Sequence, residues 1–287
     1  MAQTRAQARG DAPGTAATSQ KKQTKQSHSK TKTSATSKEQ SIKKTKTNAK
    51  GTSRNGRDQD AVNSLNSKYG ASKVTENPTI KALIDKYGAI PLANTDVVDP
   101  LSPHPETILA LLLNAMFSSA RISHELAAKA VDYAIKANYH KLDALKKSTW
   151  QKRTEVLTEG GYARYREKTA TFLGDLAVLL QDKYDGDLNN LVTAADTSPP
   201  KIRAALKEIK GLGDVGVDIF FDTAQGVWPC LAPFIDPRNR KTAEAIGIGS
   251  DIDKLWKEVG EDPAEMCKLA GALTTVRLEK KEGEFDV

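Results

Sequence analysis

A single aspartate that follows a glycine-rich turn is the strongest chemical signal in this chain. Gly211-Leu212-Gly213 lies between two segments with helical spacing of apolar residues, and Asp236 follows one helix later in a Pro-rich turn. A glycine turn at the start of a helix holds backbone N–H groups where a phosphate can bind. A carboxylate nearby can stabilise a developing cation or orient an attacking water.

Both features also have a purely structural explanation. Gly211 and Gly213 could form only a helix C-cap and a turn between two core helices. Asp236-Pro237 has the pattern of a helix N-cap followed by proline at the first helical position. Capping and catalysis are compatible for one aspartate. Asp236 is therefore the candidate catalytic residue, and the glycine turn (Gly211, Leu212 and Gly213) is the candidate phosphate contact.

The basic charge of the chain is concentrated at its N-terminus. The first 60 residues hold 14 Lys and Arg against four Asp and Glu, a net charge of +10. The whole chain carries +7, so residues 61–287 carry −3. A folded part with this charge must bind nucleic acid through local features, whereas a basic tail supplies diffuse, salt-sensitive attraction.

Residues 1–76 are rich in Lys, Ser and Thr and contain almost no large apolar side chain. Such a segment cannot bury enough surface to offset its chain entropy, so we expect it to be a disordered basic tail. Its clusters Lys21-Lys22 and Lys43-Lys44 suit import into the nucleus or loose contact with DNA. A mitochondrial leader and a simple solvated linker are the alternatives.

From Asn77 onward the sequence has the periodicity of helices. The segment 106–118 is apolar on nearly every face, as expected of a buried helix. No convincing strand pattern or internal repeat is found, so residues 77–287 are predicted to form one all-α domain. The predicted helices are 79–87, 106–118, 124–138, 142–147, 150–157, 165–184, 187–193, 199–210, 215–224, 238–246, 252–259 and 263–279.

The stretch 209–240 resembles the helix-hairpin-helix DNA glycosylases of the endonuclease III type. That family has the pattern Leu-Pro-Gly-x-Gly, a helix, a Trp-Pro-containing loop, and an aspartate that opens the next helix. The corresponding positions here are residues 209–213, Trp228-Pro229 and Asp236. The resemblance extends loosely over residues 106–280. It implies a two-lobed helical fold with a DNA-facing cleft, in which the N-terminal helix packs with the C-terminal helices.

The resemblance also implies an activity: a DNA N-glycosylase of base excision repair that hydrolyses the N-glycosidic bond of a base flipped from duplex DNA. It places Asp236 beside the oxocarbenium-like sugar, reachable by solvent and facing the same cleft as the glycine turn. Two positions depart from the family. Val215 stands where bifunctional members carry a Schiff-base lysine, so we expect a monofunctional enzyme. Asp214 adds a negative charge beside the candidate phosphate contact.

These departures keep two other functions open, namely a catalytically inactive DNA-binding module with the same fold and a helical protein-interaction domain. Six further residues are candidate DNA contacts. Arg238, Arg240 and Lys241 form a basic turn after Asp236 that could hold phosphates, and Met116 could fill the gap left by a flipped base. Tyr162 and Lys168 belong to a stretch of basic and aromatic residues that suits a nucleic-acid surface. Each has a structural alternative. The basic residues could be solvated charge, Met116 could belong to the core, and Tyr162 could lie at a helix start.

The two cysteines, Cys230 and Cys267, are too few for a disulfide framework and suit a reducing compartment. They also cannot form the four-cysteine iron–sulfur loop that many endonuclease III relatives carry. We therefore expect no metal and no cofactor. Duplex DNA is the expected partner, the protein is expected to be a monomer, and no apolar run reaches the length of a membrane span.

Overall fold

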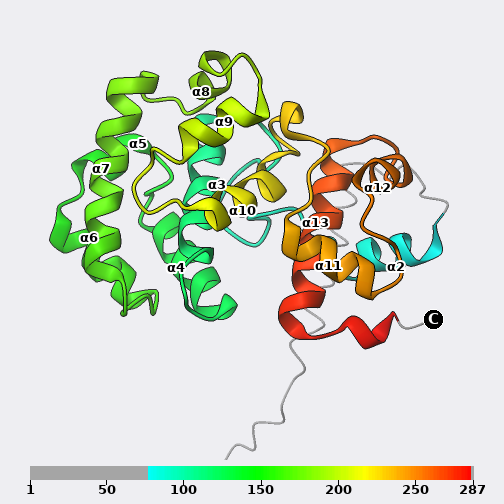
Figure 1. The fold of residues 1–287 in the computed structure, drawn as a ribbon. Helices are drawn as coiled ribbons and strands as arrows, with labels where there is room; N and C mark the ends of the chain where they lie inside the picture. The colour runs from blue at the N-terminus through cyan, green and yellow to red at the C-terminus, as the bar shows by residue number, and fades with distance from the viewer. Residues whose placement is uncertain (1–76, 286–287) are drawn as a thin grey trace, which may run out of the picture. The chain divides into compact units, whose positions relative to one another are not determined.

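The computed structural model describes residues 77–285, and every regular element within that range is helical (Figure 1). The all-α prediction is therefore confirmed for this range, whereas the prediction for residues 1–76 lies outside the described residues. All described residues belong to one compact unit. The α-helices are α2 (Pro78–Tyr87), α3 (Pro105–Ser118), α4 (His124–Lys136), α5 (Leu142–Lys147), α6 (Trp150–Glu159), α7 (Arg166–Tyr184), α8 (Asn189–Ala194), α9 (Pro199–Leu206), α10 (Asp214–Ala224), α11 (Pro237–Ala245), α12 (Ile252–Glu258) and α13 (Pro263–Glu279). Two short 3₁₀ turns, Pro229–Leu231 and Glu282–Glu284, complete the set.

Side-chain caps begin several of these helices close to the predicted residues. Asn77 accepts hydrogen bonds from the first backbone N–H groups of α2, and Ser123 and Asp262 do the same for α4 and α13. The prediction for α9 was too long, because this helix ends at Leu206 instead of Lys210. After Leu206 the chain tightens into a turn with hydrogen bonds between residues three apart, such as Ile209 N–H to the Leu206 carbonyl at 3.0 Å.

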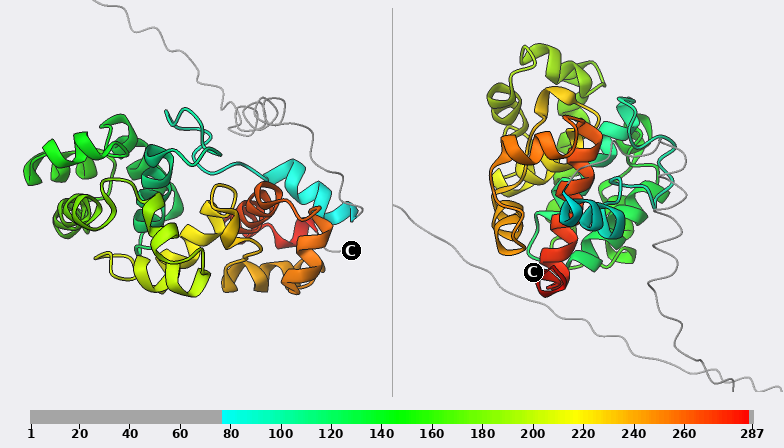
Figure 2. Two further views of the ribbon diagram at one scale, coloured as in Figure 1. Left: turned by 90° about the horizontal axis from the view of Figure 1, so that it is seen from above. Right: turned by 90° about the vertical axis from the view of Figure 1, so that its right-hand side faces the viewer.

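Buried apolar side chains gather in two clusters. The larger cluster contains the apolar residues of α3, α4, α6, α7 and α10. The smaller one joins α2 with α11, α12 and α13, through Ile80, Leu83 and Ile84 on the α2 side. The N-terminal helix thus packs against C-terminal helices, as the resemblance implied, and α2 lies beside α13 in both sets of views (Figures 1 and 2).

Helix α10 connects the two clusters because it packs against α3 on one side and against α13 on the other. Its residues Val217 and Phe220 are fully buried in the larger cluster. The glycine turn lies immediately before α10, and the loop to Asp236 follows it. Among residues 77–285, no helix has both the length and the apolar character needed to cross a membrane.

The packing of α2 on α13 predicts a large stability effect at Leu83, which is fully buried. We expect Leu83→Ala to lower the free energy of unfolding by about 2–5 kcal/mol, because it leaves a cavity in the smaller cluster. Chemical denaturation measures this value. The control is Lys81→Ala on the exposed side of α2, which should stay within about 0.5 kcal/mol of wild type. Equal effects of the two substitutions would show that α2 does not depend on this packing.

Candidate active site

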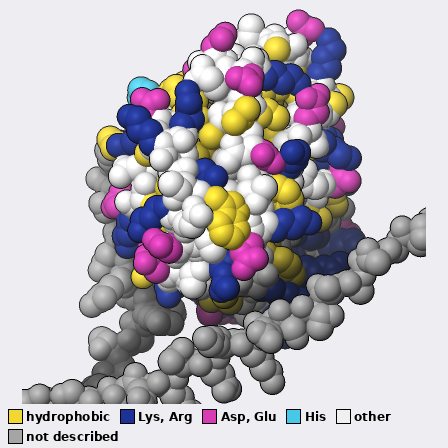
Figure 3. Space-filling model, turned by 90° about the vertical axis from the view of Figure 1, so that its left-hand side faces the viewer, with side chains coloured by type: hydrophobic (Ala, Val, Ile, Leu, Met, Phe, Trp, Pro, Cys, Tyr) yellow, Lys and Arg dark blue, Asp and Glu magenta, His cyan; other side chains and the backbone are white. Residues whose placement is uncertain are grey.

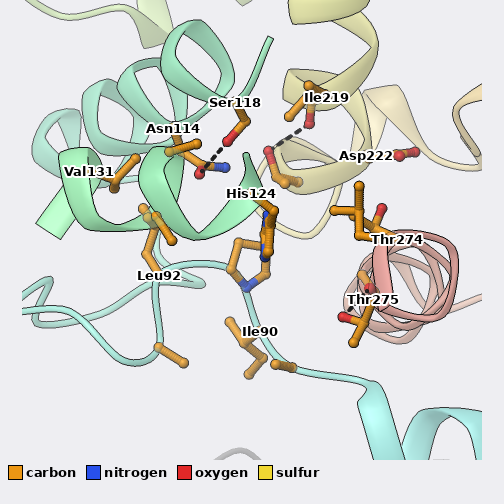
Figure 4. Close-up of a pocket in the computed structure, with 18 of the residues that line it drawn as sticks. Ile90, Leu92, Asn114, Ser118, His124, Val131, Ile219, Asp222, Thr274 and Thr275 are labelled. Atoms are coloured by element: carbon orange, nitrogen blue, oxygen red, sulfur yellow. Dashed lines mark hydrogen bonds between the residues drawn. The ribbon is translucent and has the colours of Figure 1, made fainter. Parts of the chain in front are cut away.

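A pocket of about 390 Å³ lies between the helices of the two clusters. It is lined by the turn-rich segment 89–95 and by side chains from α3, α4, α10, α11 and α13. Figure 4 shows Asn114 and Ser118 on one side of this space, with Asp222 and Thr274 on the other. The volume lies within the range of small-molecule and cofactor sites, so the pocket can hold a group the size of a nucleobase.

Asp236 borders this pocket and caps α11, with its side chain accepting a 2.7 Å hydrogen bond from the Arg238 backbone N–H. The Arg238 guanidinium forms a bidentate ion pair with the same carboxylate, in which Nε lies 3.0 Å and 2.9 Å from its two oxygens. Asp236 is only 1% exposed as a result. The expectation of a solvent-reachable carboxylate was therefore wrong, because Arg238 covers it.

A second carboxylate, Asp222 on α10, lies directly beside Asp236 and is also buried. One Asp222 oxygen accepts the Asp236 backbone N–H at 2.8 Å, and the other accepts the side-chain amide of Asn239 at 2.8 Å. Asn239 in turn accepts a hydrogen bond from Arg277 Nε at 3.1 Å. This network ties α10, α11 and α13 together, so the position of Asp236 depends on all three helices.

The two carboxylates differ in their surroundings. Burial, and then the nearby charge of Asp236, raise the pKa of Asp222 well above its ordinary value. The hydrogen bond with Asp236 raises the pKa of Arg238, so this guanidinium keeps its positive charge against the Asp236 carboxylate. The site therefore combines one acid that resists ionisation with one carboxylate that has its own counter-ion, which is how two neighbouring acids acquire different roles.

Of the two glycines in the turn, only Gly211 has the positive φ that was expected of both, since Gly213 has φ = −89°. Gly211 has φ = +89°, and a Cβ at this position would lie 2.5 Å from the Phe172 ring. Gly213 is the N-cap of α10, where no side chain caps the first turn, and a Cβ there would meet nothing within 4 Å. Residues 213–215 are exposed, so the start of α10 is open to solvent, in the arrangement that suits an anion.

Two lysines modify the charge near this turn. The carboxylate of Asp214 forms an ion pair with Lys207 at 2.7 Å, and this hydrogen bond lowers the pKa of Asp214. Its negative charge is thereby partly compensated beside the turn. Lys168 on α7 lies over the ring of Phe172, with Nζ 5.4 Å from the ring centroid. Because Phe172 packs on Gly211, the predicted contacts Lys168 and the glycine turn are neighbours in space.

Three of the predicted contacts have buried side chains. Met116 is 5% exposed within the larger cluster, so its predicted role as a wedge is corrected to a core residue. Tyr162 is 3% exposed and packs on Phe117 with ring centroids 5.3 Å apart, so its predicted contact with DNA is corrected in the same way. The Leu212 side chain is buried as well, which leaves only the backbone of the glycine turn for a ligand.

The remaining predicted contacts are at the surface. Arg240 and Lys241 are exposed on α11, and Arg240 Nε donates to the Ser250 carbonyl at 3.2 Å. Val215 is 44% exposed at the start of α10. On the face that Figure 3 displays, basic and acidic side chains are interspersed and form no broad region of one sign. A nucleic acid on this face would have to bind through separate local contacts.

The structure adds three residues that the sequence interpretation missed: Asp222, Arg277 and Asn114, all of which line the pocket. Asn114 had a usable signal, since it interrupts an otherwise apolar helix and is followed four residues later by Ser118. Asp222 and Arg277 had none, because each is an ordinary polar residue in an amphipathic helix. Only the packing of α10 against α13 brings them together.

No protein-family model matches this sequence, and no curated protein sequence matches it significantly.

The raised pKa of Asp222 predicts a pH dependence of stability. Ionising this buried acid costs the folded state more than the unfolded state, so stability falls as pH rises above the ordinary value of 3.8 toward the folded pKa. We expect the free energy of unfolding of wild type, relative to Asp222→Asn, to decrease as pH increases from 4 to 8.

Denaturant titrations at several pH values measure this difference, with Asp253→Asn on the exposed side of α12 as the control for loss of one carboxylate. If the free energy of unfolding of wild type and of Asp222→Asn changed with pH in the same way, the raised pKa of Asp222 would be contradicted.

Proposed function

We propose that this chain is a DNA N-glycosylase of base excision repair with a two-lobed helix-hairpin-helix fold. The two hydrophobic clusters correspond to the lobes, and the pocket between them receives the flipped nucleotide. The observation that carries the proposal is the position of Asp236, an aspartate at a helix start that borders a nucleobase-sized pocket. The resemblance in residues 209–240 supports the same assignment.

Helix α10 supplies the link between DNA binding and chemistry. Val215, Ile219 and Asp222 are spaced four and three residues apart, so they lie along one side of the helix. This side leads from the glycine turn, where a backbone phosphate would bind, to the pocket beside Asp236. The distance along the helix axis from Asp214 to Asp222 is about 12 Å, which one or two nucleotides can span.

In the proposed reaction, the bond between C1′ of the sugar and the base nitrogen breaks, and the base leaves with the electron pair. Asp236 stabilises the positive charge that develops on the sugar and accepts a proton from the water that attacks C1′. Val215 cannot form an imine with the opened sugar, so the product is an abasic site. For this chemistry Arg238 must turn away from Asp236, and a DNA phosphate is a suitable alternative partner for its guanidinium.

The bidentate pair between Arg238 and Asp236 also favours a second candidate function, the catalytically inactive DNA-binding module. A carboxylate that stays covered by a guanidinium acts as a structural cap and meets no substrate. In that case the glycine turn binds DNA and the pocket does no chemistry. The two candidates differ in one measurable result, which is the formation of abasic sites.

The proposed enzyme predicts that Asp236→Asn abolishes base release. Asparagine keeps the helix cap but lacks the negative charge, so we expect a decrease of about 100-fold or more in the rate. The assay incubates the full-length protein with a panel of damaged and mismatched duplexes and then cleaves abasic sites with alkali.

The matched control for this assay is Asp251→Asn, because Asp251 caps α12 in the same way and does not line the pocket. Its rate should equal that of wild type. If wild type binds the duplexes but forms no abasic sites on any of them, the enzyme is excluded and the binding module is supported.

The glycine turn predicts a separate effect on DNA affinity. Gly213→Ala adds a methyl group into open space, at φ = −89°, so the fold should tolerate it. The methyl group would keep a phosphate from the first N–H groups of α10, and we expect DNA binding to weaken about fivefold. Fluorescence anisotropy at fixed salt measures the affinity, and thermal unfolding verifies the fold. Unchanged affinity in a folded variant would place the DNA contact elsewhere.

A further inference from the structure

Asn114 is a polar residue on a helix that is otherwise buried and apolar. It belongs to α3, in which ten of the 14 residues are buried, and its half-buried side chain lines the pocket. Its amide oxygen accepts one long hydrogen bond, at 3.4 Å, from the Ser118 hydroxyl. Within residues 77–285 no other hydrogen bond is formed by this amide. It therefore keeps both donors and part of its acceptor capacity for a ligand.

The two hydroxyl groups of α13 that line the pocket already form hydrogen bonds within the protein. Thr275 donates to the Gly271 carbonyl at 3.1 Å, and Thr274 accepts from the Asn239 amide at 2.7 Å. Asn114 also lies on the opposite side of the pocket from the carboxylates, and Figure 4 shows its amide directed across the space toward α10. We expect a nucleotide whose sugar lies at Asp236 to extend its base away from that carboxylate, toward Asn114.

We propose that Asn114 is a specificity-determining residue that binds the edge of an uncharged base. This inference rests on the proposed function. A carboxamide presents a donor and an acceptor in one plane, so it matches a base edge on which an acceptor and a donor are adjacent. Uracil and oxidised guanine have such edges, with a ring N–H beside a carbonyl. Ser118, which already contacts the amide, orients it for this contact.

The walls of the pocket favour a neutral base over a positively charged one. Cationic bases, such as purines alkylated on a ring nitrogen, are bound best by the open face of an aromatic ring. Among residues 77–285, Tyr87 and His124 are the only aromatic residues that line this pocket. The ring of Tyr87 is already occupied by Lys281 and Lys86, whose Nζ atoms lie 4.7 Å and 5.2 Å from its centroid.

The other lining side chains are a mixture of aliphatic, polar and charged groups. The larger aliphatic side chains include Ile90, Leu92, Ile122, Val131 and Ile219. The two acids face the two arginines at the same end of the pocket: Asp222, Asp236, Arg238 and Arg277. Burial disfavours ionisation of Asp222, so the acids do not outweigh the two arginines and this end of the pocket does not attract a cation. The aliphatic side chains add no attraction either, so the pocket selects by shape and by the hydrogen bonds of Asn114.

The test is equilibrium binding of the full-length protein to four fluorescent duplexes. They carry uracil, 8-oxoguanine, 7-methylguanine (a cationic purine) or a tetrahydrofuran residue that has no base. The sugars of the damaged nucleotides are 2′-fluorinated, so that no base is released during the measurement. We expect at least one of the two neutral lesions to bind about tenfold more tightly than 7-methylguanine. Asn114→Leu should weaken that binding about tenfold but change the affinity for the tetrahydrofuran duplex less than twofold.

Two further variants keep the test decisive. Thr275 lines the same pocket, and its hydroxyl already donates a hydrogen bond to the Gly271 carbonyl. Thr275→Val should therefore leave all four affinities within twofold of wild type. Asn114→Ser retains a small polar group and replaces the leucine variant if that variant does not fold. Tightest binding of 7-methylguanine, or an equal loss on the tetrahydrofuran duplex in the Asn114 variant, would overturn the inference.

Because the readout is binding, its failure differs from failure of the proposed enzyme. An Asn114-dependent preference without any abasic site in the alkali assay would retain the base contact and reject the glycosylase. Abasic sites that depend on Asp236, together with a preference for 7-methylguanine, would retain the glycosylase and reject the role of Asn114.

Discussion

The structure depends on how it accommodates two adjacent buried carboxylates, Asp222 and Asp236. Burial of an unpaired charge is costly, and removal of one partner from a fully buried pair costs about 3–5 kcal/mol. The chain compensates Asp236 with a bidentate arginine and a helix cap, and it satisfies Asp222 with a backbone N–H and the Asn239 amide. Arg238 is partly exposed, so solvent reduces the energy of its pair below the fully buried figure. The arrangement holds α10, α11 and α13 in register where the two hydrophobic clusters meet.

The same arrangement gives the site its two-sided character. On one side, charged groups from α10, α11 and α13 are linked to one another by hydrogen bonds. On the other side, α3 presents Asn114 and Ser118 among aliphatic neighbours. A ligand that is polar at one end and flat and uncharged at the other fits both sides. A nucleotide with its sugar at the carboxylates meets this description, which is why the proposed base contact and the proposed chemistry fall on opposite walls.

Charge has a different distribution from the one that the basic pI of about 9.2 suggests. The excess of Lys and Arg belongs to the first 60 residues, whereas the remainder of the chain is slightly acidic. At the glycine turn, ion pairs such as Lys207 with Asp214 and Lys210 with Asp175 further reduce the free positive charge. Attraction of this part of the chain to DNA would therefore come from backbone N–H groups and a few side chains, at short range, and would depend strongly on exact fit.

The amino-acid sequence by itself determined the helices, because apolar spacing and capping residues are local signals. The structure confirms the expected helix start after Ser123, and Gly211 marks the turn that only a residue tolerating φ = +89° forms easily. It also identified Asp236 as a helix-opening aspartate. Tertiary structure alone decided which polar groups face each other. Asp222 is 14 residues from Asp236, and Arg277 reaches Asn239 from 38 residues away. Burial of Met116 and Tyr162, and the cover that Arg238 forms over Asp236, likewise follow from packing between helices. Local periodicity carries no record of such contacts, because it reports only which side of a helix is apolar and not which neighbour that side meets.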